Sequence, residues 1–465
     1  MTKIVPPAKQ LLISGQSGAV AIMTAIMMFL LLGFAAFAVD FGYSYVVKNE
    51  LQNTADAAAL AGASVLFSDN PNCLASGSPF ACCTGLGTGS CVQGIIDDNN
   101  VTLTAEALVG LNIADDKISI TNVDIGHYAF ASTWDAPGIF STAASYTQMT
   151  GWHTMPFSVL NGRTDYINSV KVTVTRSDVP RFFSRIWSTS DLGITAQATA
   201  YIGFAGTLLP DEVDQPIAIC KQKIINDDEK TYTCSVGRMM NQNTQTSYWT
   251  DFDQANCGTA DVNKIGDVTE KCSKNGTPII FGTGMSTTNA TATTVLKDIL
   301  ECWKNGLYDS NNDGELDSPI DTDNNDIPDK PWRITLPVVD CPPPDNDNCR
   351  TVVGAVVVNV VWITDEGNDE KPTDKKISEN SGMPSTMSNP LPGGTDWNKS
   401  EHPECAVSDL DCWNKFVDEF NLEGGTAEWK PSSLYFLPDC QVHSPTGSTG
   451  GENFGIQARY PVLVK

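Results

Sequence analysis

Basic residues are scarce in this chain of 465 residues, which has 29 Lys and Arg against 55 Asp and Glu. The formal net charge at pH 7 is −26. Proteins that bind nucleic acids neutralise phosphates with clustered Lys and Arg, so this balance argues against that class of function. The chain is 41% hydrophobic, which excludes wholesale disorder, and its length predicts two or three domains.

Recognisable catalytic motifs are also missing. The sequence has no H-E-x-x-H zinc motif, no G-x-S-x-G nucleophile motif and no G-x-x-x-x-G-K-[ST] phosphate loop. Its four histidines are scattered at His127, His153, His402 and His443. We interpret each as a surface or hydrogen-bonded side chain rather than a catalytic base. We therefore predict no enzyme activity and no small-molecule substrate.

Cysteine is plentiful, but the C-x-x-C spacing of zinc ribbons, iron–sulfur sites and thioredoxin-like motifs does not occur. An even number of 14 cysteines without metal-site spacing indicates disulfides formed in an oxidising compartment. Spacing alone does not determine the connectivity. The candidate local pairs are Cys73 with Cys91, Cys220 with Cys234, Cys341 with Cys349, and Cys405 with Cys412.

One run near the N-terminus has no charge. Residues 17–39 carry only two polar side chains, and an apolar helix of this length spans roughly 30 Å of hydrocarbon. A buried soluble helix and a cleavable signal peptide are the alternatives, but a signal peptide has an apolar region of only about 7–15 residues. We predict a retained single-pass membrane anchor. Lys3 and Lys9 then place residues 1–16 in the cytoplasm and export the chain after Gly42.

The helix is expected to continue beyond the membrane. Residues 44–67 contain no proline and many strong helix formers, so one helix is predicted over residues 17–67. Small residues recur at helical spacing in the second part of this helix and form a stripe. Such a stripe permits close approach to a helix of another subunit or to the chain's own globular domain, and both alternatives stay open. The small residues at helical spacing are Ala55, Ala58, Ala59, Gly62 and Ala63.

Three sequence pieces in this region carry a resemblance. Residues 18–22 read GAVAI, residues 38–42 read AVDFG, and residues 51–63 read LQNTADAAALAGA. In this order and spacing they resemble the N-terminal segment of TadE/TadG-like Flp (tight-adherence) pilus-assembly proteins. Residues 166–200 are more loosely similar to the exported domain of TadG-like proteins, so the resemblance covers roughly residues 16–206.

The resemblance implies a TadG-like, single-pass protein of a bacterial inner membrane, with a cytoplasmic N-terminus and a periplasmic or surface-exposed bulk. It also implies that other pilus-assembly proteins are the partners. Pilin-like processing is not expected, because Val20 or Met23 stands where the fifth mature position would require Glu. Some longer family members carry an integrin-like D-x-S-x-S metal site, and this sequence has none.

Alternating apolar residues predict β-strands in the first exported region. The alternation occurs in residues 117–128, 170–174 and 194–200. A long helix followed by several antiparallel strands predicts an α+β, pilin-like helix-on-sheet domain over residues 68–206.

The remaining sequence predicts a second domain. Residues 352–363 are almost continuously apolar and rich in Val, which indicates a buried central strand. Residues 333–339 are expected to pair with it, with Pro337 placing that strand at an edge or a bulge. Residues 364–404 are rich in Pro, Gly, Ser and Asp and are predicted to be a surface excursion. We predict a disulfide-rich, mainly β domain over residues 207–465.

An acidic segment at residues 309–329 contains two copies of the pattern D-x-[DN]-x-[DN]-[GD]-x-x-D, starting 12 residues apart. Oxygen ligands at alternating positions of a tight turn converge on a hard cation, and the spacing resembles tandem thrombospondin type 3 or dockerin-like calcium loops. A structural Ca²⁺ is predicted, with an acidic, hydrated linker as the alternative. The predicted ligands are Asp309, Asn311, Asp313, Asp317, Asp321, Asp323, Asn325 and Asp329.

Three functional hypotheses follow from these observations. The first is a membrane-anchored Flp/Tad pilus-assembly or minor pilus-associated protein that acts as a scaffold outside the cytoplasm. The second is a calcium-stabilised surface adhesin or binding protein, and the third is an anchored extracytoplasmic enzyme. Loss of surface fibres on deletion would favour the first, whereas intact fibres with weakened attachment would favour the second.

Overall fold

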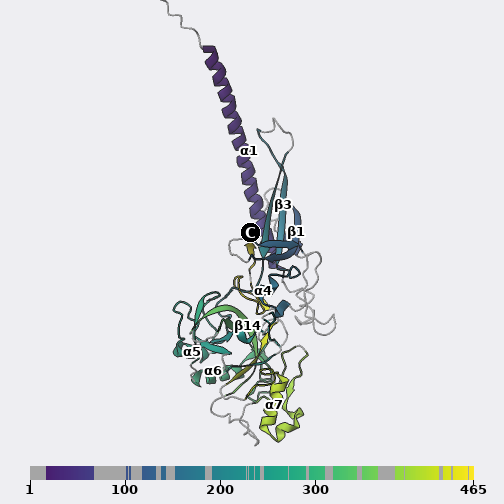
Figure 1. The fold of residues 1–465 in the computed structure, drawn as a ribbon, viewed down its shortest axis with the longest axis vertical. Coiled ribbons are helices and arrows are strands. Elements are labelled where there is room, and N and C mark those ends of the chain that lie inside the picture. The colour runs from purple at the N-terminus through teal and green to yellow at the C-terminus, as the bar shows by residue number, and fades with distance from the viewer. Residues whose placement is uncertain are drawn as a thin grey trace, which may run out of the picture.

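The computed structural model has a long N-terminal helix that leads into a body of β-strands cross-linked by disulfides (Figure 1). The strands form two main sheets, one of five strands beside the helix and one of seven strands further away. We call these the near sheet and the distal sheet. The structure describes residues 17–66, 101–102, 104–105, 118–131, 138–142, 152–183, 191–226, 228, 230–234, 236–240, 246–270, 272–289, 293–308, 318–342, 348–364, 383–391, 393–428, 433–440, 443–458 and 460–464.

Helix α1 (Ser17–Ser64) is uninterrupted over 48 residues, or about 72 Å. The continuous helix predicted from the absence of proline is confirmed to within three residues of its expected end. The side chains of residues 20–39 are largely exposed, whereas buried positions recur at helical spacing from Val47 to Ala63. The two parts of one helix therefore lie in different surroundings.

The near sheet is antiparallel throughout, with strand order β2-β1-β3-β4-β20. The three segments predicted from alternation are confirmed as β1, β3 and β4. One face of β3 and β4 buries Val and Ala, and the other face carries half-exposed Lys, Thr and Gln. The strands are β1 (Ile118–Ala129), β2 (Ile139–Thr142), β3 (Ser169–Val179), β4 (Leu192–Tyr201) and β20 (Val462–Val464).

Helix α1 covers the apolar face of the near sheet and contacts β3, β4 and β20. A register shift between Ile120 and Asn122 of β1 keeps Val123 and Ile125 on the covered face, where they pair with Val172 and Val170 of β3. Such a bulge inserts one residue and so restores the alternation in the opposite phase. The apolar pattern of β1 therefore stays continuous across the irregularity.

Strand β20 comes from the C-terminal end of the chain, yet it pairs with β4 of the near sheet. Isolated bridges from Phe204 to Gln457 and from Ala205 to Thr449 bring the same C-terminal segment alongside. This differs from the domain division predicted from the sequence, which assigned all of residues 207–465 to the second domain. Three residues of β20 carry too little periodicity to reveal their sheet.

The distal sheet has strand order β10-β8-β6-β13-β14-β17-β7. Strands β6 and β13 are parallel and the other neighbours are antiparallel. Strand β10 also pairs with the start of β14, so five strands close into a ring. The strands are β6 (Ile217–Cys220), β7 (Arg238–Met240), β8 (Ser247–Thr250), β10 (Gly284–Thr288), β13 (Trp332–Val339), β14 (Cys349–Ile363) and β17 (Leu434–Asp439).

The apolar run at residues 352–363 forms most of β14, and the prediction of a buried central strand is confirmed. Its partner β13 is also confirmed, but it lies between β6 and β14 and is not an edge strand. Pro337 precedes a register shift between Val338 and Val339 and lies just outside the short pairing with β6. A proline is tolerated there because no second strand requires its missing N–H.

Shorter elements surround the two sheets. They are the helices α4 (Phe157–Leu160), α5 (Val262–Thr269), α6 (Thr293–Lys304) and α7 (Asp409–Glu419), the 3-10 turns η2 (Trp152–Thr154), η4 (Lys221–Lys223), η5 (Lys399–Glu401) and η6 (Pro403–Ala406), and the strands β5 (Thr207–Leu208), β9 (Ile279–Ile280), β11 (Leu307–Tyr308), β12 (Ser318–Pro319), β15 (Thr386–Met387), β16 (Trp397–Asn398), β18 (His443–Thr446) and β19 (Ile456–Ala458).

The described end of the predicted surface excursion alternates exposed residues with buried anchors. Met387 and Trp397 in residues 383–404 are fully buried, and Trp397 packs edge-to-face on Phe416 of α7. Helix α7 begins at a Ser408 cap and presents Trp413 and Phe416 to the sheet. The polar composition of this segment predicted exposure and gave no sign that Met387 and Trp397 are buried.

Five disulfides join the described cysteines, and two of the predicted local pairs are wrong. Only the predicted pair Cys405–Cys412 is present among these five. Cys220 bonds Cys341 rather than Cys234, since Val339 of β13 pairs directly with Cys220 of β6. Strand pairing therefore selects partners 92, 121 or 206 residues apart. The other bonds are Cys234–Cys440, Cys257–Cys349 and Cys272–Cys302, and the predicted pair Cys73–Cys91 lies outside the described residues.

Candidate functional site at the junction of helix and near sheet

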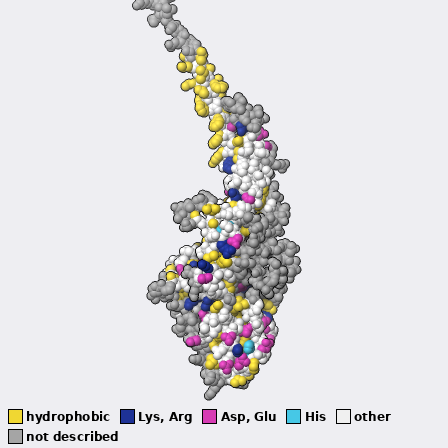
Figure 2. Space-filling model, turned by 45° about the vertical axis from the view of Figure 1, so that its right-hand side comes forward, with side chains coloured by type: hydrophobic (Ala, Val, Ile, Leu, Met, Phe, Trp, Pro, Cys, Tyr) yellow, Lys and Arg dark blue, Asp and Glu magenta, His cyan; other side chains and the backbone are white. Residues whose placement is uncertain are grey.

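The N-terminal half of α1 has an apolar surface that nothing in the described structure covers. Its most apolar 18-residue window has a mean hydropathy of 2.5 and is 0% buried. Figure 2 shows these side chains as a column of hydrophobic atoms that rises from the body. Phe29 and Phe34 are each 72% exposed. By length and composition, the helix is able to cross a membrane.

Asp40 marks the end of this apolar column. Its side chain is 9% exposed, and its carboxylate accepts the backbone N–H groups of Phe182 at 2.8 Å and Phe183 at 3.2 Å. Tyr43, one turn further along α1, packs edge-to-face on Phe182 with 5.3 Å between ring centroids. Hydrogen bonds to a carboxylate are stronger than those between neutral groups, so Asp40 ties the helix to the segment that follows β3.

Polar side chains continue the attachment along β4. The Lys48 ammonium donates to the carbonyl oxygen of Thr195, and Gln52 Nε2 donates to that of Gln197 at 3.0 Å. Both bonds use backbone carbonyls of a strand, so they fix the position of α1 along β4 without requiring particular side chains there.

The predicted stripe of small residues lies in the interface between α1 and the near sheet. Its alanines, Ala55, Ala58, Ala59 and Ala63, are 0% exposed. A Cβ atom at Gly62 would lie only 3.2 Å from Val170 Cγ1 and 3.3 Å from Val101 Cγ1. Because the chain's own sheet occupies this stripe, a helix of another subunit would have to contact a different face of α1.

Half of the predicted calcium ligands lie in described residues. Asp321 accepts the backbone N–H groups of Asn325 at 3.2 Å and Asp326 at 2.9 Å, and Asp323 accepts the Asn325 amide at 2.8 Å. Asp329 accepts both the N–H and the hydroxyl of Thr322. The segment is thus a turn closed by its own carboxylates.

Within the described part of the chain, no group of three or more His, Cys, Asp and Glu side chains is placed to hold a metal ion. The other four predicted ligands, Asp309, Asn311, Asp313 and Asp317, lie outside the described residues. The calcium site stays a prediction.

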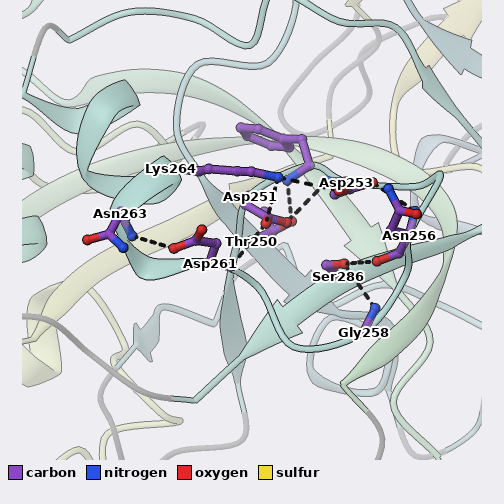
Figure 3. A network of polar contacts seen from close by, with 10 residues as sticks. Thr250, Asp251, Asp253, Asn256, Gly258, Asp261, Asn263, Lys264 and Ser286 are labelled. Carbon is purple, nitrogen blue, oxygen red and sulfur yellow. Dashed lines mark hydrogen bonds and ion pairs between the residues drawn. The ribbon is translucent and has the colours of Figure 1, made fainter.

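A polar network beside a hollow of about 540 Å³ was not anticipated from the sequence (Figure 3). The Lys264 ammonium lies 3.8 Å from Asp251 and 3.4 Å from Asp253, and Asp251 also accepts the N–H of Asp261 at 3.0 Å. The backbone N–H of Asn256, followed by Lys264, lowers the pKa of Asp253. The partners of Asp253 therefore favour its charged form, and the network holds Asp251, Asp253 and Lys264 together as ion pairs.

The described histidine side chains have structural surroundings. His127 is buried, with its ring nitrogens against the carbonyl oxygens of Tyr166 and Asn161, and His402 stacks on Trp397. His443 lies against Arg333 and 3.5 Å from Asp439. Burial lowers the pKa of His443 to about 4; Asp439 opposes this shift and Arg333 adds to it.

The parts described so far define a class of protein: an apolar N-terminal helix with the properties of a membrane anchor, followed by mostly β structure with five disulfides. Residues 18–65 match the family model described as putative Flp pilus-assembly TadE/G-like. This match coincides with α1 and agrees with the resemblance of these residues to TadE/TadG-like proteins. No curated protein and no solved structure matches the chain.

Proposed function

We propose that this protein is a membrane-anchored component of a Flp pilus-assembly apparatus and acts as a scaffold outside the cytoplasm. The observation that carries the proposal is the division of α1 into an exposed apolar half and a half that completes the core of the near sheet. The pilus family match lies on this helix. The proposed topology is single-pass, with residues 1–16 in the cytoplasm and the two sheets outside it.

The energetics support a bilayer around the N-terminal half of α1. Thirteen large apolar side chains from Val20 to Val39 are exposed. Burial of one such side chain contributes about 1.5–3 kcal/mol, so together they favour transfer out of water by tens of kcal/mol. No strand of the described structure covers them. A lipid bilayer provides this environment around the whole circumference of the helix.

The continuity of the helix supports the proposed scaffold role. No flexible linker separates the proposed anchor from the near sheet, because α1 passes directly from one to the other. We call the distal sheet and the disulfide-bonded elements around it the distal body. We propose that this helix-on-sheet unit is pilin-like in outline and holds the distal body at a defined position above the membrane. Other pilus-assembly proteins would be its partners.

A deletion strain tests the function, with surface pili counted by electron microscopy and attachment scored in parallel. Absence of pili, restored by the wild-type chain, is the expected result. Normal pili with weakened attachment would instead support the adhesin alternative.

A pair of point variants tests the anchor. Leu31→Arg places a charge in the apolar half of α1, and Val407→Arg places the same charge at an equally exposed position, 73% against 68%, in the distal body. We expect Leu31→Arg, and not Val407→Arg, to lower the fraction of protein retained by carbonate-washed membranes and to weaken the restoration of pili, because a charge at a helix centre costs about 2.5–3.5 kcal/mol of the favourable insertion energy. Equal release of both variants by the carbonate wash, together with release of the wild type, would contradict the anchor.

A further inference from the structure

The described part of the segment that follows β3 contains two adjacent phenylalanines that are about half exposed. Phe182 is 53% exposed and Phe183 is 47% exposed, whereas Val179 at the end of β3 is 0% exposed. A single exposed apolar side chain is ordinary on a protein surface. Two neighbouring aromatic rings beside an uncovered apolar helix form a continuous patch, which indicates a contact surface.

The position of this patch is set by α1. The Asp40 carboxylate, which follows directly after the charge-free run, holds the backbone N–H groups of both phenylalanines. On the helix, Phe37 and Phe41 stack with 6.4 Å between ring centroids, and Phe41 is 66% exposed. Figure 1 shows β3 rising beside α1 toward the exposed part of the helix. The rings of Phe182 and Phe183 therefore lie at the depth where the apolar column ends.

We propose that Phe182 and Phe183 rest in the interfacial layer of the bilayer that α1 crosses, so that the partner of this surface is a lipid membrane. This inference rests on the proposed membrane anchor. Aromatic residues concentrate at the boundary between hydrocarbon and water, where a ring is covered while neighbouring polar groups stay hydrated. Asp40 lies at the same boundary, and its carboxylate is already satisfied by backbone N–H groups, which lowers the cost of keeping a charge there.

A lipid surface fits better than a protein partner because the patch is continuous with the anchor. The apolar window of α1 is uncovered on all sides, as a bilayer requires and as a one-sided protein interface does not. A membrane around α1 must pass the level of Asp40, and the two rings are tied to that residue. The unit formed by α1 and the near sheet would thus contact the membrane at two places, which restricts its tilt relative to the membrane.

Photo-crosslinking in the full-length protein tests this contact. p-Benzoylphenylalanine would replace Phe182 or Phe183 singly, which keeps an aromatic side chain and leaves the backbone N–H groups for Asp40. Phe37 in the anchor is the positive control. Phe130, which is 38% exposed and follows β1 at the opposite end of the near sheet, is the negative control. Native membranes are irradiated, and adducts are identified by mass spectrometry.

We expect lipid adducts at Phe37, Phe182 and Phe183 and none at Phe130. Lipid adducts at Phe37 without any at the other two positions would overturn the inference and leave the anchor intact. Protein adducts at Phe182 and Phe183 in place of lipid adducts would also overturn it. Absence of lipid adducts at Phe37 would mean that the proposed anchor itself has failed.

Asp40→Ala adds a test of the tether. Loss of the acceptor frees the segment after β3, so lipid labelling at Phe182 should fall about threefold or more, while labelling at Phe37 stays unchanged. The matched control is Asp56→Ala, which removes a carboxylate elsewhere on α1 that bonds Gln52 rather than the β3 end. Equal labelling in Asp40→Ala and wild type would show that Asp40 does not position the rings.

Discussion

The near and distal sheets are stabilised in different ways. The described part of the near sheet contains no disulfide, and its core consists mainly of Val and Ala beneath α1. The distal sheet and the elements around it carry all five described disulfides and a core with several tryptophans, in which Trp362 contacts Trp413, Phe416 and Tyr435. Packing against a long helix thus stabilises the near sheet, whereas disulfides and aromatic packing stabilise the distal sheet.

This difference follows from the role of α1. The near sheet obtains a long, rigid apolar surface from the same helix that forms the proposed anchor, and small residues let that surface approach closely. The described distal helices are much shorter, at 8 to 12 residues for α5, α6 and α7. Cross-links and large rings compensate there, because disulfides reduce the entropy of the unfolded chain and aromatic side chains bury a large area each.

The two sheets meet through a small aromatic cluster formed by Trp152, Leu160, Tyr166 and Phe204. The fully buried Asn453, from the C-terminal segment, donates its amide to the carbonyl oxygens of Trp152 at 2.9 Å and Met155 at 2.7 Å. The chain therefore returns from the distal sheet through this cluster to β20. Two separate chain segments connect the sheets, which supports a rigid scaffold better than a single linker would.

Removal of a long-range disulfide should produce the largest difference in stability between the two sheets. Cys220→Ala with Cys341→Ala removes a bond that spans 121 residues. We expect the distal sheet to lose roughly 2–5 kcal/mol of unfolding free energy, because the unfolded chain gains entropy. Hydrogen exchange on the full-length protein in detergent should show reduced protection in β13 and β14 and unchanged protection in β3 and β4.

The matched control for this prediction is Cys405→Ala with Cys412→Ala, whose bond spans only 7 residues. Its loss should cost about 2 kcal/mol less, since the entropy of loop closure grows with loop length. Equal loss of protection in both sheets would show that they unfold as one unit and would contradict the comparison.

Acidification should also destabilise the distal sheet selectively. The pKa of His443 is lowered from 6.5 to about 4 by burial, so the unfolded chain takes up this proton at a higher pH than the folded chain. The contribution of His443 to stability is therefore complete above pH 6.5 and is lost as the pH falls toward 4. Between pH 6.5 and 5 we expect a loss of about 2 kcal/mol, measured by denaturant titration with tryptophan fluorescence.

His443→Gln removes this titration and retains a polar side chain against Arg333 and Asp439. The pH dependence of the variant should be flatter than that of the wild type in the same range. His402→Gln, which alters a histidine stacked on Trp397, serves as the control. A wild-type slope that persists in His443→Gln would assign the acid sensitivity to other groups.

Enlargement of a buried alanine should affect only the near sheet. Ala59→Leu adds three carbons at a fully buried position between α1 and the sheet. Overpacking of this kind costs about 1–3 kcal/mol, so protection of β3 and β4 should fall while the distal strands are unaffected. The same change at the half-buried Ala57 of α1 is the control and should have less than half the effect. A stable Ala59→Leu variant would mean that the helix–sheet interface is loosely packed.

The local periodicity of the sequence predicted much of the fold. Helix α1 followed from a long segment without proline, and β1, β3 and β4 followed from alternation, because both signals are local in the chain. The pairing of Cys220 with Cys341 and the return of β20 to the near sheet depend on contacts between distant segments. Neighbouring cysteines in the sequence are poor guides where strand order decides which ones meet.

Parts of the candidate site were predictable in the same limited way. The apolar column and the stripe around Ala59 were visible as patterns, but the sequence left open whether that stripe met another subunit or the chain's own sheet. The contact from Asp40 to Phe182 joins residues 142 positions apart and had no local signal. The one available clue was that Asp40 is the first acidic residue of the chain and stands at the end of a charge-free run.

Calcium should produce the smallest effect, and it concerns the acidic segment of the distal body. We propose that Ca²⁺ binds residues 309–329. At 1 mM Ca²⁺ and a dissociation constant of about 0.1–1 mM, mass action stabilises the folded state by about 0.4–1.4 kcal/mol. Replacement of Ca²⁺ by EDTA should therefore lower the melting temperature by a few degrees at most.

Asp323→Asn is the sharper variant, because Asp321 and Asp329 also hold backbone N–H groups of the turn, whereas Asp323 bonds only the Asn325 side chain among the contacts described. Loss of the calcium response in Asp323→Asn, with the melting temperature in EDTA unchanged, would separate a bound ion from the hydrogen bonds of the turn; identical wild-type melting curves in Ca²⁺ and EDTA would contradict the site.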